Sequence, residues 1–338
     1  MTRVPLAVIG LGFMGSRWAR VLAEHPGAHL RVVCDVREDV GRETAERYGA
    51  RFVADPLEAA SDLEVAAVAV CTPEHLHVEP ALAAIDAGKP LMVEKPLAHS
   101  AENAERIRDR ARGRGVPVLA GHILRFEPRY AAARRAIEEG ELGDVQAVRH
   151  ERIGLVADQE VLRGRTSIPL YYGVHEFDLA RWYAGDVERV YAERSEGVLR
   201  AHGYELADLY SAVIRFTSGA HGTAMLGWSL PGETTGYGIA GVTVIGERGF
   251  VRVTQGDVGL VIVNESGMRG ADVYYAPEVH GRVRGALAIE ADHFVAVARG
   301  DADPLCTAED GTEAVRVSLA MEASAECGRP VDLADTVR

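Results

Sequence analysis

Three glycines and one aspartate near the start of the chain have the spacing of a phosphate-binding turn. Gly10, Gly12 and Gly15 end an apolar run and open a helix-like segment, and Asp35 follows 20 residues after Gly15, at the end of a second apolar run. Gly10 would permit the tight turn, Gly12 a close backbone approach to a pyrophosphate, and Gly15 close helix–strand packing. The pattern predicts a dinucleotide site in which Asp35 accepts hydrogen bonds from ribose hydroxyls.

The identity of the dinucleotide depends on two charged residues. Asp35 favours NAD, whereas Arg37 could bind a 2′-phosphate and leaves NADP possible. Phe13 and Met14 belong to the same turn and are expected beside the cofactor. A strand–helix turn without a cofactor is the competing interpretation, but the agreement of strand, spacing and acidic residue favours a cofactor.

Lysine is nearly absent, and one of the two lysines stands at a strand end. Of 37 basic residues, only Lys89 and Lys95 are not arginine. Lys95 directly follows the apolar run 90–94, at the edge where open α/β sheets bind ligands. Lysine can be tuned as an acid or hydrogen-bond donor, whereas arginine stays charged. Lys95 is therefore predicted to point into the cofactor cleft, and Lys89, after Gly88, to be a capping or turn residue.

Short apolar runs alternate with helix-length segments over the first 120 residues or so. This alternation predicts a doubly wound parallel sheet of the Rossmann type with right-handed crossovers, and we assign it to a cofactor domain of residues 1–122. The apolar runs cover residues 6–10, 30–35, 65–71, 90–94 and 116–120.

The pattern changes after a predicted helix at 128–139. Longer runs with polar alternation begin at Val145, which predicts a large, mostly antiparallel open sheet with one covered face. Together with helices predicted at 173–184, 284–299 and 308–326, they form an α+β domain of residues 123–338 for substrate binding and oligomerisation.

Composition excludes several classes of protein. The 338 residues carry a net charge of −13, which argues against nucleic acid as a partner. No apolar run reaches the ~18 residues needed to span a bilayer, so no membrane partner is expected. The start of the chain lacks a signal-peptide pattern, and the four cysteines form no CxxC pair, so we expect a reducing cytoplasm.

Motifs along the whole chain resemble those of one enzyme family. Besides the glycine turn, they are Thr72-Pro-Glu-His-Leu-His77, Ala87-Gly-Lys89, Glu94-Lys95-Pro96, the segment 121–126 and the segment 173–182. Their order is similar to that in the glucose–fructose oxidoreductase / inositol dehydrogenase / MocA family. The resemblance implies cofactor contacts from Thr72, Pro73, His77, Glu94 and Lys95, and a cis peptide before Pro96.

The resemblance also implies a catalytic pair. Lys95 and His175 would sit together at the nicotinamide, where a substrate hydroxyl loses its proton while its carbinol hydride moves to nicotinamide C4. His175 is the candidate general base, because a histidine pKa lies near working pH. Lys95 would hydrogen-bond the same oxygen and stabilise the developing alkoxide.

One position departs from the family pattern. Inositol dehydrogenases commonly have aspartate four residues before the histidine, and this chain has Tyr171 there, followed by Tyr172. Either phenol could donate a hydrogen bond or act as a weak acid. Asp178 shares a helix face with His175 and could contact a substrate hydroxyl, although solvation at the helix surface is an equal alternative.

Three arginines and one histidine–aspartate spacing could supply further substrate or metal contacts. Arg125, Arg163 and Arg165 are possible substrate contacts, with solvated arginine as the alternative for each. The His175-x-x-Asp178 spacing invites a metal, but no further ligand cluster supports one, so none is predicted.

These observations favour an NAD(P)-dependent oxidoreductase that acts on a secondary hydroxyl or ketone of a sugar, inositol or related polyol. The alternatives are a non-catalytic nucleotide-binding regulator on the same fold and an NAD-dependent redox glycosidase. Because open sheets usually bury their outer face in an interface, residues such as Val213, Phe216 and Met225 predict a homodimer or homotetramer.

Overall fold

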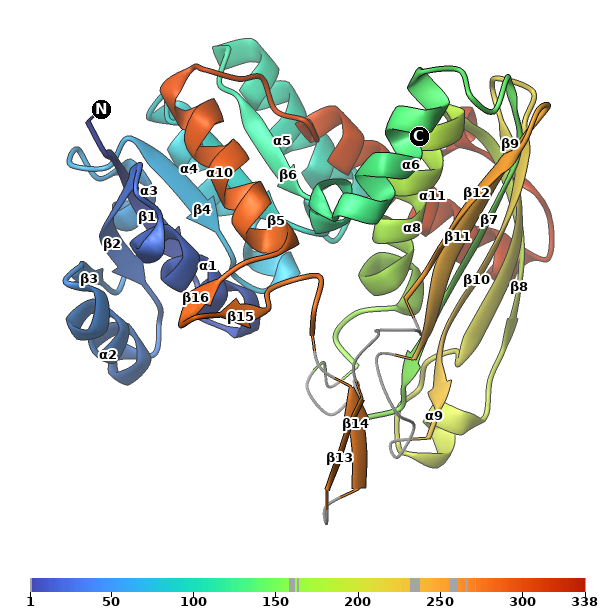
Figure 1. Cartoon of the computed structure of the whole chain (residues 1–338), viewed down its shortest axis with the longest axis horizontal. Helices are drawn as coiled ribbons and strands as arrows, with labels where there is room; N and C mark the ends of the chain where they lie inside the picture. Colours follow the sequence, from blue (N-terminus) through green and yellow to red (C-terminus); the bar gives the residue numbers. More distant parts are fainter. Residues whose placement is uncertain are drawn as a thin grey trace. The chain divides into compact units, whose positions relative to one another are not determined.

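The chain forms two compact units. The computed structural model describes residues 2–157, 162, 164–231, 238–255, 261–264, 267–270 and 272–337. The first unit comprises Met1–Glu127 and Tyr274–Thr312, and the second comprises Pro128–Val273 and Glu313–Arg338 (Figure 1). The segment Tyr274–Thr312 thus packs with the N-terminal residues, although its place in the sequence had assigned it to the domain of residues 123–338.

The first unit contains the predicted parallel sheet. Its strand order is β3-β2-β1-β4-β5-β6, and every neighbouring pair is parallel. Helices cover both faces of such a sheet, so successive side chains of each strand are buried. This explains why the strands are short continuous apolar runs. The strands are β1 (Val4–Ile9), β2 (Ala28–Cys34), β3 (Arg51–Val53), β4 (Ala67–Val70), β5 (Leu91–Glu94) and β6 (Val118–Gly121).

Helices connect these strands, and local residues fix their ends. The Asp55 side chain accepts a hydrogen bond from the backbone N–H of Leu57 at the start of α3. Lys89 donates to the backbone carbonyl of Asp62, the C-cap of this helix, so its side chain contacts the end of a different helix from the one that precedes Gly88. The helices are α1 (Phe13–Glu24), α2 (Glu38–Tyr48), α3 (Pro56–Ser61), η1 (Glu74–Leu76), α4 (Val78–Asp86), α5 (Ala101–Arg114) and η2 (Ile123–Phe126).

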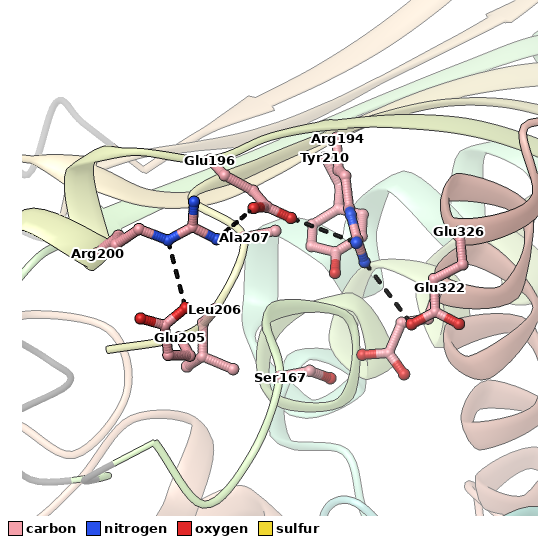
Figure 2. A pocket seen from close by; sticks show the side chains of 10 residues that line it. All are labelled: Ser167, Arg194, Glu196, Arg200, Glu205, Leu206, Ala207, Tyr210, Glu322 and Glu326. Atoms are coloured by element: carbon pink, nitrogen blue, oxygen red, sulfur yellow. Dashed lines mark hydrogen bonds and ion pairs between the residues drawn. The ribbon is translucent and has the colours of Figure 1, made fainter. Parts of the chain in front are cut away.

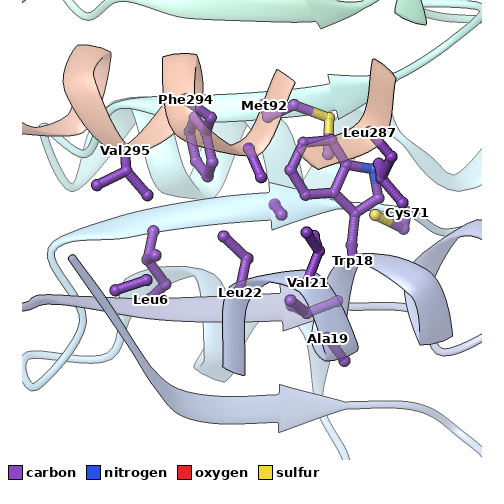
Figure 3. Packing of buried hydrophobic residues seen from close by; sticks show 14 of the residues in the cluster. Leu6, Trp18, Ala19, Val21, Leu22, Cys71, Met92, Leu287, Phe294 and Val295 are labelled. Carbon is purple, nitrogen blue, oxygen red and sulfur yellow. The ribbon is translucent and has the colours of Figure 1, made fainter. Parts of the chain in front are cut away.

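A late segment of the chain completes the core of the first unit. It contains β15 (Glu278–Val279), β16 (Arg282–Val283) and α10 (Ala286–Arg299). Phe294 of α10 packs edge-to-face on Trp18 of α1, with ring centroids 6.2 Å apart and planes at 89° (Figure 3). The apolar face of α10 packs against the parallel sheet of this unit and against α1. These partners are far from α10 in the sequence, so no local pattern predicts this packing.

Two glutamates are buried inside this unit, in different environments. Glu94, at the end of β5, accepts hydrogen bonds from Trp18 Nε1 at 2.9 Å and from the Lys95 backbone N–H at 3.2 Å. Glu290 of α10 is fully buried, and neither carboxyl oxygen has a hydrogen-bond partner among the described residues. Burial raises the pKa of Glu94 and, further, that of Glu290, which the charge of Glu94 raises again. Burial therefore favours the neutral carboxyl more strongly at Glu290 than at Glu94.

The second unit is a helix-backed open sheet. Its strand order is β12-β11-β7-β10-β9-β8-β17, and only β7 and β10 pair in parallel, so the sheet is mixed and mostly antiparallel, as expected. The strands are β7 (Val145–Leu155), β8 (Val187–Ser195), β9 (Leu209–Phe216), β10 (His221–Leu230), β11 (Ile239–Gly246), β12 (Phe250–Thr254) and β17 (Val331–Asp332), with a separate hairpin of β13 (Val261–Asn264) and β14 (Gly267–Gly270).

Helices cover one face of this sheet (Figure 1). The helices on this face are α6 (Pro128–Glu138), α8 (Val174–Ala184) and α11 (Ala308–Cys327), of which α11 up to Thr312 belongs to the first unit. The second unit also contains the π-helical turn η3 (Pro169–Gly173), the short α9 (Val198–Ala201) at one end of the sheet, and η4 (Leu333–Val337) (Figure 1). In the described ranges, no helix combines the length and the apolarity that crossing a membrane requires.

Two of the three residues predicted on the outer face of the sheet lie there, and one does not. Val213 and Met225 point outward, with 54% and 41% of their surface exposed, but Phe216 is 1% exposed. Successive side chains of a strand alternate between faces, so residues 213 and 216 face opposite ways. The prediction that Phe216 lies on the outer face is wrong.

We expect Glu290→Gln to remove a pH dependence from the stability of the fold. Folding raises the pKa of Glu290 above its ordinary value of 4.5, so stability is fully present below that pH and falls as the pH rises toward the folded-state pKa. One proton gives a slope of ~1.4 kcal/mol per pH unit. In urea unfolding, the free energy of unfolding of the variant should rise relative to that of wild type as the pH increases above the ordinary glutamate pKa of 4.5.

The control is Glu46→Gln, which changes an exposed glutamate of α2. Its difference from wild type should stay constant over the same pH range. An equally constant difference for Glu290→Gln would contradict a neutral Glu290.

Candidate functional site

The glycine turn contains two glycines, Gly10 and Gly15, at which the packing leaves no room for a side chain. At the third, Gly12, there is room for one. Gly10 has φ +86°, and a Cβ there would lie 2.7 Å from the carbonyl oxygen of Cys71. A Cβ on Gly15 would lie 1.7 Å from the Gly10 carbonyl oxygen, so α1 packs directly on the turn. A Cβ on Gly12 would meet no atom within 4 Å. Gly12 therefore offers bare backbone to a ligand.

The surroundings of Gly12 suit an anionic group. No side chain caps the start of α1, and its first turn contains no acidic residue, so the partial positive charge of the helix end stays available. Nearby, at the end of β4, the buried Thr72 hydroxyl has no hydrogen-bond partner in the described part of the chain. Both features fit the pyrophosphate of a dinucleotide.

Asp35 is held in its ionised form beside this turn. Its Oδ2 accepts the Leu11 backbone N–H at 2.8 Å, and its Oδ1 accepts the Arg37 backbone N–H at 2.9 Å. Arg37 Nε and Nη2 also donate to the two carboxylate oxygens, at 3.1 and 3.2 Å. Burial acts to raise the pKa of Asp35, but these hydrogen bonds outweigh it and lower the pKa. A charged acceptor thus stands where the sequence predicts the ribose contact.

The two intervening turn residues differ in exposure. Phe13 is 71% exposed, and the Arg17 guanidinium lies 3.6 Å from the centre of its ring. Met14 is partly buried and packs on the apolar core of the first unit. Phe13 is therefore accessible to a ligand, whereas Met14 mainly serves packing.

The other predicted cofactor contacts lie at the carboxyl ends of β4 and β5. The peptide between Lys95 and Pro96 is cis, as the resemblance implied. His77 is buried, and its ring nitrogens lie 2.9 Å from the Pro96 carbonyl oxygen and 2.8 Å from that of Thr72. His77 thus ties the two strand ends together, and its ring nitrogens are used within the protein. Pro73 begins the short turn η1 that carries the chain from Thr72 to His77.

Glu94 fixes the backbone that carries Lys95. Because Glu94 accepts bonds from both the Trp18 indole and the Lys95 N–H, it connects α1 to the end of β5. The Lys95 side chain is half-buried. Glu94 therefore acts inside the protein, as a support for Lys95.

Arg125 has a structural position that the sequence did not indicate. Its side chain is buried, its Nη1 donates to the Leu305 carbonyl at 2.8 Å, and its Nη2 lies 3.2 Å from Asp310 Oδ1. It ties η2 to the residues around 305–310, within the first unit. These contacts argue against the predicted substrate contact.

The other predicted substrate residues gather in the second unit. Tyr171 and Tyr172 are half-buried in η3, and their ring centroids lie 5.6 and 5.5 Å from that of buried Trp228. His175 is half-buried in the first turn of α8. Asp178 is fully buried, which overturns solvation at the helix surface as its role. Arg165 is exposed, and Arg163 lies outside the described residues.

A buried ionic cluster next to His175 was missed. Glu176 Oε1 accepts a hydrogen bond from Arg152 Nε at 2.5 Å, and His150 Nδ1 lies 3.0 Å from Glu176 Oε2. Burial acts to raise the pKa of Glu176, but Arg152 and His150 outweigh it and lower the pKa. The signal in the sequence was the polar pair His150 and Arg152, which alternation places on one face of β7.

A polar cavity of about 230 Å³ in the second unit contains none of the predicted residues (Figure 2). Its two arginines are already paired. Arg194 lies 3.3 Å from Glu196 and 3.6 Å from Glu326, and Arg200 lies 2.7 Å from Glu196. Since both arginines are engaged by glutamates of the lining and no predicted residue lies there, this cavity is not the candidate site.

Family models match both parts of the chain. Residues 4–122 match the Gfo/Idh/MocA model described as an oxidoreductase family with an NAD-binding Rossmann fold. Residues 134–333 match the model of the C-terminal alpha/beta domain of the same oxidoreductases.

Individual proteins match over nearly the full length. Inositol 2-dehydrogenase 1 of Saccharopolyspora erythraea is 31% identical over 98% of this chain and 96% of its own. The scyllo-inositol 2-dehydrogenase (NAD(+)) of Bacillus subtilis is 28% identical over 98% and 96%. The crystal structure of GenD2 from gentamicin A biosynthesis, in complex with NAD, superposes with a TM-score of 0.81 at 29% identity and covers 98% of this chain and 97% of its own.

We expect Gly12→Ala and Gly15→Ala to fail in different ways. Gly12 has φ −71° and open space for a Cβ, so its alanine variant should keep the wild-type melting temperature. It should weaken NAD binding about tenfold or more, because the methyl group fills the approach of the pyrophosphate. Gly15→Ala should lower the yield of folded protein, because its Cβ collides with the Gly10 carbonyl.

Thermal unfolding and calorimetric titration with NAD measure the two effects. Equal NAD affinity in Gly12→Ala and wild type would contradict this placement of the cofactor.

Proposed function

This chain belongs to the Gfo/Idh/MocA oxidoreductase family, and from that premise we propose that it oxidises a ring hydroxyl of an inositol or a closely related cyclitol. It is an NAD-dependent dehydrogenase that acts on CH–OH groups of polyols or sugars. The observation that supports inositol is the full-length similarity to two proteins named as inositol dehydrogenases. Neither the regulator nor the redox glycosidase receives support from these relatives.

The proposed reaction divides between the two units. The first unit would hold the cofactor through the Gly12 backbone, the start of α1 and Asp35, as predicted for residues 1–122. The second would supply substrate contacts, as predicted for residues 123–338. When bound, NAD⁺ accepts a hydride from the carbinol carbon and leaves a ketone, NADH and a proton.

Two side chains would manage the proton and the charge on oxygen. His175 would take the hydroxyl proton at a ring nitrogen, because neutral imidazole is a base near neutral pH. The Lys95 ammonium would donate a hydrogen bond to the same oxygen and stabilise its developing negative charge. Glu94 and the cis Lys95–Pro96 peptide support the backbone from which Lys95 extends.

Further substrate contacts are proposed in the second unit. Tyr171 would offer its phenol where related enzymes commonly have a carboxylate, so it would donate rather than accept a hydrogen bond when it contacts a substrate hydroxyl. Tyr172 and Asp178 are proposed as additional substrate contacts, since η3 runs directly into α8, which carries His175.

We expect Lys95→Ala and His175→Ala each to lower kcat for myo-inositol by about 10²–10⁴-fold, the usual contribution of a general acid or base. His175→Ala should leave NAD affinity within about threefold of wild type, because the residue acts on substrate. NADH absorbance and calorimetric titration measure these quantities.

Lys89→Ala is the matched control, since it removes the other lysine, which contacts Asp62. It should keep the wild-type kcat. Undiminished turnover in Lys95→Ala would refute the catalytic assignment.

We also propose that the outer face of the large sheet joins two copies of the chain in a homodimer or within a homotetramer. Apolar side chains on it, Val213, Met225 and Ile245, are well exposed. Arg149 and Glu151 of β7 lie on the same face and pair with each other at 3.4 Å, so the charged groups between these apolar side chains are already partnered within the chain.

We expect the double variant Val213→Glu/Met225→Glu to have a monomeric mass, because like charges would face each other across the two-fold axis. Light scattering measures the mass. Leu63→Glu, at a fully exposed leucine of the first unit, should leave the wild-type mass unchanged. A monomeric wild type would refute the proposed interface.

We further propose a reducing compartment, the cytoplasm, for this enzyme. The support is that all four cysteines are free thiols and that three of them are buried. Burial raises the pKa of Cys34 to about 12 and that of Cys71 strongly, which makes both thiols unreactive.

A further inference from the structure

The residue after His175 faces the interior of the second unit. Glu176 is 1% exposed and lies in the first turn of α8. Its two carboxylate oxygens bind two side chains of β7, Arg152 at 2.5 Å and His150 at 3.0 Å. The first turn of α8 is therefore attached to the sheet by two directional contacts.

The same arginine also contacts the segment before His175. The Arg152 guanidinium lies 5.9 Å from the centre of the Tyr172 ring, within range of a cation–π interaction. Arg152 thus touches Tyr172, three residues before His175, and Glu176, the residue after it. Its Nη1 also lies 3.3 Å from Gln255 Oε1, and Gln255 donates to the Tyr130 hydroxyl at 3.0 Å.

An ionic cluster is an unusual means of holding a helix. Apolar side chains of similar size often hold an interior together at least as well as a buried ion pair, because burying charges is costly. Apolar contacts have no preferred direction, however, whereas a charge-assisted hydrogen bond fixes the donor and acceptor geometry. The cluster is thus better suited to setting an orientation than to adding stability.

The orientation of Glu176 determines that of His175. Successive side chains of an α-helix are ~100° apart around its axis. With Glu176 turned toward β7, His175 must project ~100° away, and it is half-buried there. Rotation of the first turn of α8 would move both side chains together.

We propose that Glu176, held by Arg152 and His150, is a positioning residue for His175. It fixes the rotation of the first turn of α8 and with it the direction of the imidazole. The inference rests on the proposed role of His175 as the base of the reaction.

The far end of α8 offers a matched control. Tyr183, in its last turn, donates from its hydroxyl to the Tyr130 carbonyl at 3.0 Å. Tyr183→Phe removes a buried contact of the same helix, two turns from His175. It should lower stability without affecting the orientation of the first turn.

The experiment compares Glu176→Gln with Tyr183→Phe in the full chain. Glu176→Gln keeps the size of the side chain but removes the charge that orders Arg152 and His150. Hydrogen exchange should show faster exchange at amides 174–178 in this variant only. With myo-inositol, its kcat should fall about 10–100-fold, as misplacement of a reacting group does, while KM for NAD stays within about twofold.

An isotope effect separates positioning from general destabilisation. Deuterium at the oxidised carbon should slow kcat more in Glu176→Gln than in wild type, because a misplaced base makes the chemical step limiting. Tyr183→Phe should show the wild-type isotope effect and a kcat within about twofold. Equal losses of kcat in both variants, with unchanged isotope effects, would overturn the proposal.

Two further results remain decisive. If Glu176→Gln does not fold, Arg152→Lys keeps the positive charge but loses the planar fork, and it should show the same exchange pattern with a smaller loss of kcat. If wild type oxidises no polyol, the proposed function fails. Unchanged protection of amides 174–178 in the folded variant would then still refute the positioning role, and faster exchange confined to that variant would support it.

Discussion

The contact between Gly15 and the carbonyl of Gly10 is the constraint on which the first unit depends. Because no side chain separates them, α1 lies directly against the end of β1. This contact directs the start of α1 at the space beside Gly12, and it places Trp18 where its indole donates to Glu94. Glu94 in turn accepts the N–H of Lys95. One close approach therefore sets both the glycine turn and the strand end that carries Lys95.

The two units support their candidate catalytic residues in the same physical way. A buried carboxylate precedes Lys95 in the sequence, and another follows His175. Glu94 accepts bonds from an indole and a backbone N–H, and Glu176 interacts with an arginine and a histidine. Each carboxylate accepts at least one hydrogen bond from another element, so it fixes the backbone beside a residue that we propose to act on substrate.

Prediction succeeded where the signal was local. The continuous apolar strands, the glycine turn with Asp35 and the motif Glu94-Lys95-Pro96 each depend on residues close in sequence, and the structure contains them as expected. It was incomplete where distant segments meet. Neither the packing of α10 on Trp18 nor the contact of Arg125 with residues 305–310 has a sequence signal, because the partners lie far apart in the chain.

The sequence by itself determined the family, the parallel sheet and the residue types that carry the chemistry, since motif spacing and apolar periodicity encode them directly. Tertiary structure alone decided which face each side chain occupies and which buried charge finds a partner. Phe216 faces inward, Arg125 is bound within the protein, burial raises the pKa of Glu290, and Glu176 joins Arg152. The physical reason is that burial and hydrogen bonding arise from elements brought together by folding, so no local pattern contains them.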